Sequence, residues 1–150
     1  MSDHVYKRHN KTLLLYHIVF PAKYRRKVIT RAVEETLHHV CDGISQRYEI
    51  KFLEIGSDED HIHFLIQSVP NLSITRIVTI LKSITAREIY KTHPEVKKLL
   101  WGGNFWTSGY YVNTVGSHGT EEVIQNYVKE HGGNYKKIYN QQLSLFDDII

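Results

Sequence analysis

Segments with the apolar pattern of a β-strand and segments with that of an amphipathic helix alternate along the chain. Residues 12–20 are almost all apolar, rich in aromatic and β-branched side chains, and end at Pro21, which is typical of a central strand buried on both faces. Residues 31–48 carry apolar side chains at helical spacing behind a candidate N-cap, Thr30, which indicates an amphipathic helix. The polar residues 1–10 before them are expected to be loosely ordered at the very end.

The middle of the chain predicts a hairpin. Residues 50–56 and residues 61–66 are both strand-like, and the acidic segment 57–60 joins them directly. Two strands with so short a connection pair antiparallel.

Two further helices and one strand complete the pattern. Ser73 is a candidate N-cap of a second long helix, and residues 94–100 predict a short helical turn. Residues 105–115, dense in aromatic side chains, predict a fourth strand. Residues 120–131 predict a third long helix that ends at two glycines.

The order strand, helix, strand, strand, helix, strand has a hairpin at its centre. This βαββαβ order predicts an α+β fold of the ferredoxin-like type, with an antiparallel sheet, helices on one face and an added C-terminal helix. We expect one domain over residues 1–133 and a C-terminal tail over residues 134–150.

Composition narrows the function without deciding it. The chain has 150 residues, 41% of them hydrophobic, which suits a single soluble domain. Its net charge of +3 permits nucleic acid as a partner but does not require it. The single cysteine, Cys41, excludes an internal disulfide and a cysteine-based zinc cluster. Without a signal peptide or an apolar run of membrane-spanning length, we expect a soluble, cytoplasmic protein.

Two histidines, His61 and His63, flank Ile62 in the second strand of the hairpin. Successive side chains of a strand point to opposite faces, so both imidazoles are expected on one face, where they can hold a divalent metal. The alternative is a pair of histidines that line a half-buried strand. His17 in the first strand is interpreted as a hydrogen-bonded core histidine.

Cations gather in one connecting segment and on one helix. Four cations surround an aromatic residue after the first strand, which is a pattern that can pair with phosphates and stack on a base. The alternative is a solvated basic surface. The candidate nucleic-acid contacts are Lys23, Tyr24, Arg25 and Arg26 in this segment, and Arg76, Lys82 and Arg87 on the second long helix.

The predicted C-terminal helix carries Tyr127 and His131, four residues apart and therefore on one helical face. A tyrosine beside a bound metal can act as a nucleophile, because a nearby cation favours the phenolate. The alternative is a tyrosine that only packs against the sheet.

Taken together, these segments resemble the HUH single-tyrosine nucleases. They are most similar to the small TnpA transposases of the IS two-hundred group of bacterial insertion sequences. The matching segments appear in the same order and at family-like spacing; they are residues 16–20, 23–26, 60–65, 105–111 and 127–128.

The resemblance implies a metal-dependent transposase that cleaves and rejoins single-stranded DNA. It makes His61 and His63 ligands of Mg²⁺ or Mn²⁺, and Tyr127 the nucleophile that forms a 5′-phosphotyrosine. It further implies recognition of DNA hairpins, a homodimer, and no nucleotide cofactor. The family commonly has glutamine where this chain has His131, so the imidazole of His131 takes the role of third ligand in place of an amide and favours transition metals over magnesium.

Two other functions fit parts of the sequence. One is a replication initiator or relaxase-type nickase with the same HUH chemistry, and the other is a non-catalytic ferredoxin-like module that binds nucleic acid. The tail also contains a pentapeptide similar to the one by which bacterial proteins dock on the replication sliding clamp; its residues are Gln142, Leu143, Ser144, Leu145 and Phe146. The alternative is a tail that packs on its own domain or its dimer mate.

Overall fold

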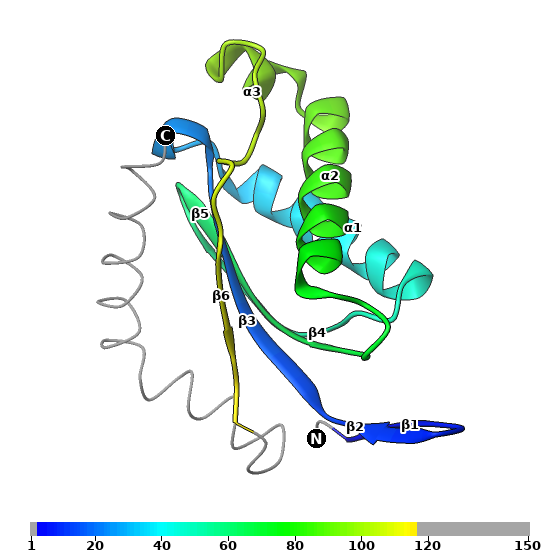
Figure 1. Cartoon of the computed structure of the whole chain (residues 1–150). Coiled ribbons are helices and arrows are strands. Elements are labelled where there is room, and N and C mark those ends of the chain that lie inside the picture. Colours follow the sequence, from blue (N-terminus) through cyan, green and yellow to red (C-terminus); the bar gives the residue numbers. More distant parts are fainter. Residues whose placement is uncertain (1–2, 117–150) are drawn as a thin grey trace.

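The computed structural model describes residues 3–116, whose main body is a four-stranded antiparallel sheet with two long helices packed on one face (Figure 1). The spatial order of the strands is β4, β5, β3, β6, and every neighbouring pair is antiparallel. In sequence order the elements of this domain are β3 (Leu14–Pro21), α1 (Arg31–Arg47), β4 (Lys51–Asp58), β5 (His61–Ser68), α2 (Ile74–Thr92), α3 (Pro94–Leu99) and β6 (Tyr111–Thr114). The predicted ferredoxin-like order is confirmed.

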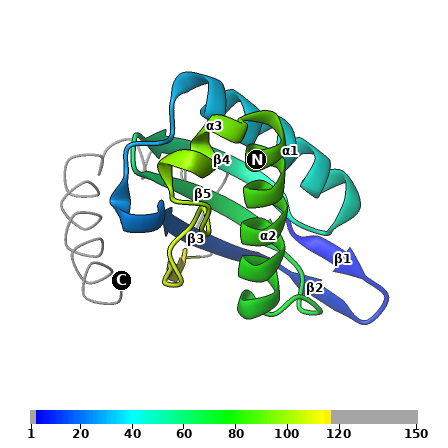
Figure 2. The ribbon, with the colours of Figure 1, turned by 90° about the horizontal axis from the view of Figure 1, so that it is seen from above.

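The helices lie where the apolar periodicity placed them. Thr30 and Ser73 accept hydrogen bonds from the backbone three residues on, as N-caps do, at the starts of α1 and α2. Seen from above, both helices lie across the sheet (Figure 2). Their buried sides enclose the main core against one face of the sheet, to which the strands contribute Ile18, Phe20, Ile62, Phe64 and Ile66.

The fourth strand is shorter than predicted. Phe105 and Trp106 are consecutive and both belong to the core, which the alternation of a strand does not allow. The carbonyls of Thr107 and Gly109 accept hydrogen bonds from Lys82 instead of from a neighbouring strand. Between residues 105 and 110 the strand-like pairing is an isolated bridge between Ala22 and Trp106, and regular pairing begins at Tyr111.

The polar N-terminal segment, for which no element was predicted, is ordered from Val5 onward. Residues 5–12 form a two-stranded ribbon of β1 (Val5–Lys7) and β2 (Asn10–Thr12) that projects from the sheet. An ion pair between Lys7 and Glu49 ties this ribbon to the domain.

Several predictions concern residues outside the described range. They are the helix over residues 120–131 with Tyr127 and His131, the domain limit at residue 133, and the clamp-like pentapeptide from Gln142 to Phe146. Within residues 3–116, no helix is long and apolar enough to cross a membrane.

Candidate functional site

His61 and His63 lie on the face of the sheet opposite α1 and α2, as the alternation predicts. Their neighbour Ile62 is fully buried in the core on the other face. In the strand ladder, His63 pairs with Val19 on one side and Gly56 on the other. Two imidazoles therefore stand on one rigid central strand.

Gly56 makes room for the ring of His63. A Cβ atom built on Gly56 would lie 2.2 Å from Nε2 of His63 and 2.3 Å from its Cε1, so any side chain at this position would force the ring to move. The imidazole therefore occupies the space over the glycine, and the backbone of β4 sets where it lies. The sequence analysis missed this role, although a glycine inside a strand is a recognised sign of close approach.

His61 is oriented by a carboxylate. Its Nδ1 lies 2.9 Å from Oδ1 of Asp60, and Oδ2 of Asp60 lies 3.1 Å from the guanidinium of Arg25. The hydrogen bond with His61 and the charge of Arg25 lower the pKa of Asp60 in spite of its partial burial. A charged Asp60 that accepts the Nδ1 proton leaves the lone pair of His61 on Nε2, which is the usual arrangement of a metal-binding histidine.

A third imidazole lies beside this pair. The ring of His17 is 6.1 Å from that of His63 and 6.3 Å from that of Tyr111. Burial, and in addition the proximity of His63, lower the pKa of His17 to about 4 even though a hydrogen bond with Asn113 acts against this. His17 is buried and hydrogen-bonded as expected, but on the side of the histidine pair and not in the main core.

The protonation state of His63 suits a ligand of a divalent metal. Burial and the neighbouring His61 lower the pKa of His63 to about 4, so its imidazole is neutral at physiological pH and can donate a lone pair. Among the described residues, no group of three His, Cys, Asp or Glu side chains could hold a metal ion. Within this part of the chain His61 and His63 are two candidate metal ligands, and the predicted third, His131, lies outside it.

The basic segment after β3 folds against the turn that carries Asp60. The backbone N–H of Ala22 donates to the carbonyl of Asp60 at 2.8 Å, and the N–H of Lys23 donates to the carbonyl of Phe105 at 2.7 Å. Lys23–Arg25 forms a 3₁₀ turn, η1, in which Tyr24 and Arg25 have left-handed backbone angles. The structure thus brings the predicted DNA contacts of this segment next to the histidine pair.

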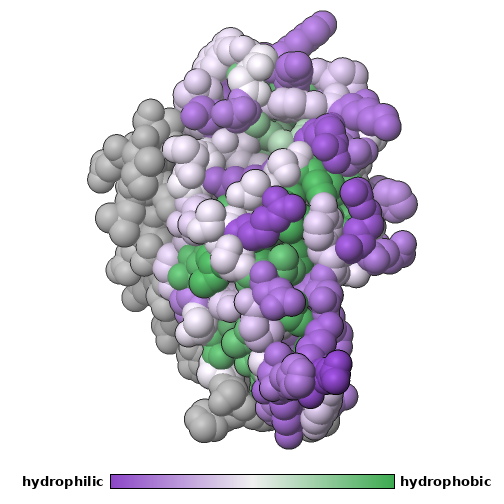
Figure 3. Space-filling view, turned by 45° about the vertical axis from the view of Figure 1, so that its right-hand side comes forward, coloured by the Kyte–Doolittle hydropathy of each residue, from purple (hydrophilic) through white to green (hydrophobic). Residues whose placement is uncertain are grey.

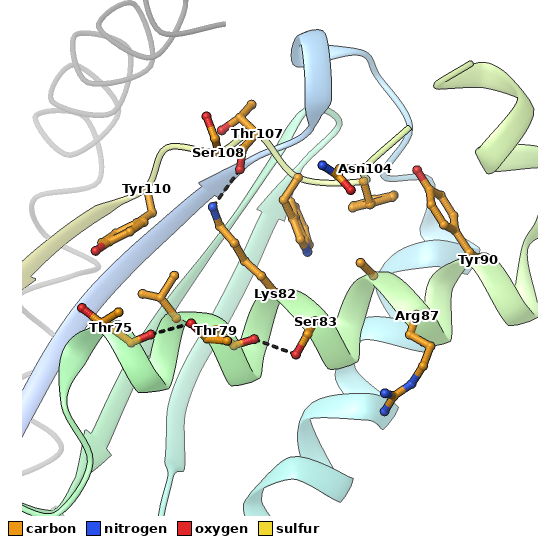
Figure 4. Close-up of a pocket in the computed structure, with 14 residues that line it drawn as sticks. Thr75, Thr79, Lys82, Ser83, Arg87, Tyr90, Asn104, Thr107, Ser108 and Tyr110 are labelled. Atoms are coloured by element: carbon orange, nitrogen blue, oxygen red, sulfur yellow. Dashed lines mark hydrogen bonds between the residues drawn. The ribbon is translucent and has the colours of Figure 1, made fainter. Parts of the chain in front are cut away.

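The cations of α2 have separate environments. Arg76 and Arg87 are exposed, whereas Lys82, the third candidate DNA contact on this helix, is half-buried and donates to two carbonyls. Burial, and in addition the nearby charge of Lys23, lower the pKa of Lys82 to about 8. Lys82 and Arg87 line a groove of about 550 Å³ between α2 and the segment before β6 (Figure 4).

This groove has a mixed lining. Hydroxyl groups of Thr75, Thr79 and Ser83 line it from α2, and the ring of Tyr110 lies at its other side. In the space-filling view from the helix side, apolar surface is exposed between hydrophilic side chains (Figure 3). The lining of the groove between α2 and the segment before β6 is compatible with a partner that presents both rings and charged groups.

Known proteins match this chain over most of its length. A family model described as "Transposase IS200 like" matches residues 10–131. The ISDra2 transposase TnpA of Deinococcus radiodurans is 32% identical over 116 residues, which is 77% of this chain and 82% of the relative. The transposase for insertion sequence element IS200 of Salmonella typhimurium is 32% identical over 133 residues, which is 86% of this chain and 84% of the relative.

A solved structure matches the fold as well. It is a crystal structure of a Deinococcus radiodurans R1 protein assigned as a transposase, with 29% sequence identity and a TM-score of 0.70. The match covers 84% of this chain and 96% of that one.

Proposed function

Because this chain belongs to the IS200-like transposase family, we propose that it cleaves and rejoins single-stranded transposon ends through Tyr127. The observation that carries the proposal is the pair of imidazoles, His61 and His63, on one face of the central strand β5, with Ile62 between them in the core on the other face. Family membership supports a DNA-processing enzyme, and the histidine pair supports the specific HUH chemistry.

In the proposed reaction, the phenol oxygen of Tyr127 attacks the scissile phosphorus, and the bond from phosphorus to O3′ breaks. The phenol gives its proton to water and the departing oxygen takes one up, so the products are a 5′-phosphotyrosine and a free 3′-hydroxyl. One phosphodiester replaces another, so attack by a second 3′-hydroxyl on the tyrosine ester rejoins DNA without a nucleotide cofactor.

We assign His61, His63 and His131 as ligands of a divalent metal, Mg²⁺ or Mn²⁺. When bound, this ion polarises the scissile phosphate and neutralises charge that develops on it. Asp60 holds the proton of His61 on Nδ1, and Gly56 leaves the space in which the ring of His63 lies.

The remaining assignments concern DNA and protein partners. Lys23, Arg25 and Arg26, with Arg76 and Arg87 on α2, are proposed to contact the phosphate backbone of a DNA hairpin at each transposon end. We propose that the enzyme acts as a homodimer. We also propose that the tail from Gln142 to Phe146 docks on the replication sliding clamp, because replication exposes the single strands that the enzyme uses.

The decisive experiment detects the covalent intermediate. The full chain is incubated with Mg²⁺ or Mn²⁺ and single-stranded hairpin DNA from the ends of its own element, and protein–DNA adducts are separated on a denaturing gel. We expect an adduct from the parent protein and none from Tyr127→Phe. Tyr111→Phe is the matched control, because the structure places this tyrosine near His17.

Each other outcome identifies a different function or nucleophile. If Tyr127→Phe forms as much adduct as the parent protein, Tyr127 is not the nucleophile. If the adduct is lost only in Tyr111→Phe, the nucleophile is Tyr111 of β6. An adduct that a second transposon end cannot resolve into joined DNA favours a nickase. No adduct from the parent protein favours a non-catalytic binding module. The variants His61→Ala and His63→Ala, shown to be folded, should no longer form the adduct when Mg²⁺ or Mn²⁺ is added.

A further inference from the structure

Two exposed aromatic rings meet at the turn η1, whose Arg25 hydrogen-bonds Asp60. Tyr24 and Trp101 are 48% and 71% exposed, yet their ring centroids lie only 5.2 Å apart. They come from η1 and from the end of α3, which are far apart in sequence. Large aromatic side chains that remain this exposed and lie next to one another form an apolar patch available to a partner.

Cations flank both rings. The guanidinium carbon of Arg26 lies 4.9 Å from the ring centroid of Trp101, and the ammonium of Lys23 lies 5.4 Å from that of Tyr24. Aromatic rings interleaved with cations are the usual surface for unpaired nucleotides, because bases stack on the rings while the cations attract the phosphates.

Trp101 occupies a backbone position that favours glycine. Its N–H donates to the carbonyl of Lys98 at 3.1 Å and that of Gly102 donates to Lys97 at 2.8 Å, which is the Schellman pattern at the end of α3. Trp101 therefore sits at the left-handed position of this motif, with a φ of 52°. A bulky residue there destabilises the helix end, so folding does not explain why an exposed tryptophan occupies it.

Two other residues with left-handed backbone angles, Tyr24 and Arg25, lie at the same patch as Trp101. Among residues 3–116, left-handed backbone angles outside glycine occur at Tyr24, Arg25 and Trp101, with φ values of 59°, 50° and 52°. All three surround one patch, and the guanidinium of Arg25 contacts Asp60, the partner of His61. Backbone strain concentrated at one exposed patch is typical of a functional surface.

We propose that Tyr24, Trp101 and Arg26 form a stacking platform for an unpaired nucleobase of single-stranded DNA, with Lys23 on the adjoining phosphate. The placing of this base next to the scissile phosphate rests on the proposed function; the stacking itself does not. Every base has a face that stacks, so the platform binds single strands with little dependence on sequence and leaves sequence recognition to other contacts.

The test uses the full chain with Tyr127→Phe, so that no cleavage occurs, and a single-stranded 20-nucleotide oligothymidine or its abasic counterpart. Trp106 is only 4% exposed, so quenching of tryptophan fluorescence by DNA reports on Trp101. We expect the oligothymidine to quench this emission and the abasic strand to bind at least about ten-fold more weakly.

Trp101→Gly separates binding from folding. Glycine suits the left-handed position, so the thermal midpoint should stay the same or rise by a few degrees, while the Kd for the oligothymidine rises about ten-fold or more. Leu99→Ala is the matched control, because it removes apolar surface that is 48% exposed at the same helix end without removing a ring. Its Kd should match that of the parent.

Unchanged binding by a folded Trp101→Gly variant would overturn the platform, and so would equal binding of the abasic strand. These results are independent of the adduct assay. A protein that forms the tyrosine adduct but shows neither effect keeps the proposed function and loses the platform, and a protein that shows both effects without any adduct keeps the platform alone.

Discussion

Adding one methyl group at Gly56 should weaken metal binding at the proposed site with little loss of stability. In Gly56→Ala the new Cβ would lie 2.2 Å from Nε2 of His63, whereas unbonded heavy atoms settle at about 3.5 Å or more. Gly56 and His63 are paired in the β4–β5 ladder, so the two backbones cannot separate without breaking it. The imidazole must therefore swing away by more than about 1 Å.

The size of the effect follows from what this displacement changes. A ring held off its favoured rotamer costs about 0.5–1.5 kcal/mol, which leaves the protein folded. A ligand moved by about 1 Å, however, no longer points its lone pair at the metal, and disturbances of this kind lower metal affinity by about 10- to 100-fold. We expect a similar fall in the rate of adduct formation, because the geometry of reacting groups is comparably sensitive.

Calorimetric titration with Mn²⁺ measures the metal affinity, and urea denaturation measures the free energy of unfolding. Gly43→Ala is the matched control, because Gly43 lies inside α1 and a Cβ there meets no atom within 4 Å. It should stabilise the protein by about 0.5–1 kcal/mol and leave the metal affinity unchanged. Parent-like Mn²⁺ affinity in a folded Gly56→Ala variant would refute the role of the glycine.

Three further predictions follow from the site. Metal-free protein should lose stability as the pH falls from 6.5 to 4, because the pKa values of His17 and His63 are about 4 when folded and 6.5 otherwise, so the unfolded chain binds more protons in this window. The loss between pH 7 and pH 5 should reach about 2 kcal/mol per histidine in urea titrations, and His17→Gln should reduce it; a flat profile would contradict these assignments. Lys82→Met should destabilise the protein by about 1–3 kcal/mol, because two carbonyls lose a charged donor, whereas Arg87→Met, which lies on the exposed side of the same helix, should change stability by less than about 0.5 kcal/mol. Asp60→Asn should lower Mn²⁺ affinity about ten-fold with little change in the thermal midpoint, and unchanged affinity would show that this carboxylate does not orient the histidine beside it.

Helices and strands that bury one face could be predicted from the spacing of apolar residues in the sequence. Apolar spacing located α1, α2 and the strands of the hairpin, because one buried face forces a period on the chain. The same alternation placed His61 and His63 on one face and Ile62 on the other. These features depend on residues close in sequence, and they therefore needed no knowledge of the tertiary structure.

Features that depend on distant contacts were not predictable in this way. The strand expected over residues 105–115 begins late because Lys82, on a preceding helix, hydrogen-bonds the carbonyls of Thr107 and Gly109. The approach of Tyr24 to Trp101 joins two turns that only the folded sheet brings together. A local sign existed at Trp101, which precedes two glycines at a predicted helix end, but it indicated a turn and not a partner.

The strained turn η1 connects the platform with the histidine pair. It presents Tyr24 outward and sets Arg25 against Asp60, and two left-handed residues in succession make this conformation unfavourable for the turn alone. If both proposals hold, a base stacked on Tyr24 and a metal held by His61 would stabilise the same conformation of the turn. Because both favour one state, we expect DNA and metal to bind cooperatively, each tightening the other by the same factor. Titration of Mn²⁺ with and without oligothymidine, and of oligothymidine with and without Mn²⁺, measures that factor from both sides; a ratio of one in each would show that the turn does not couple them.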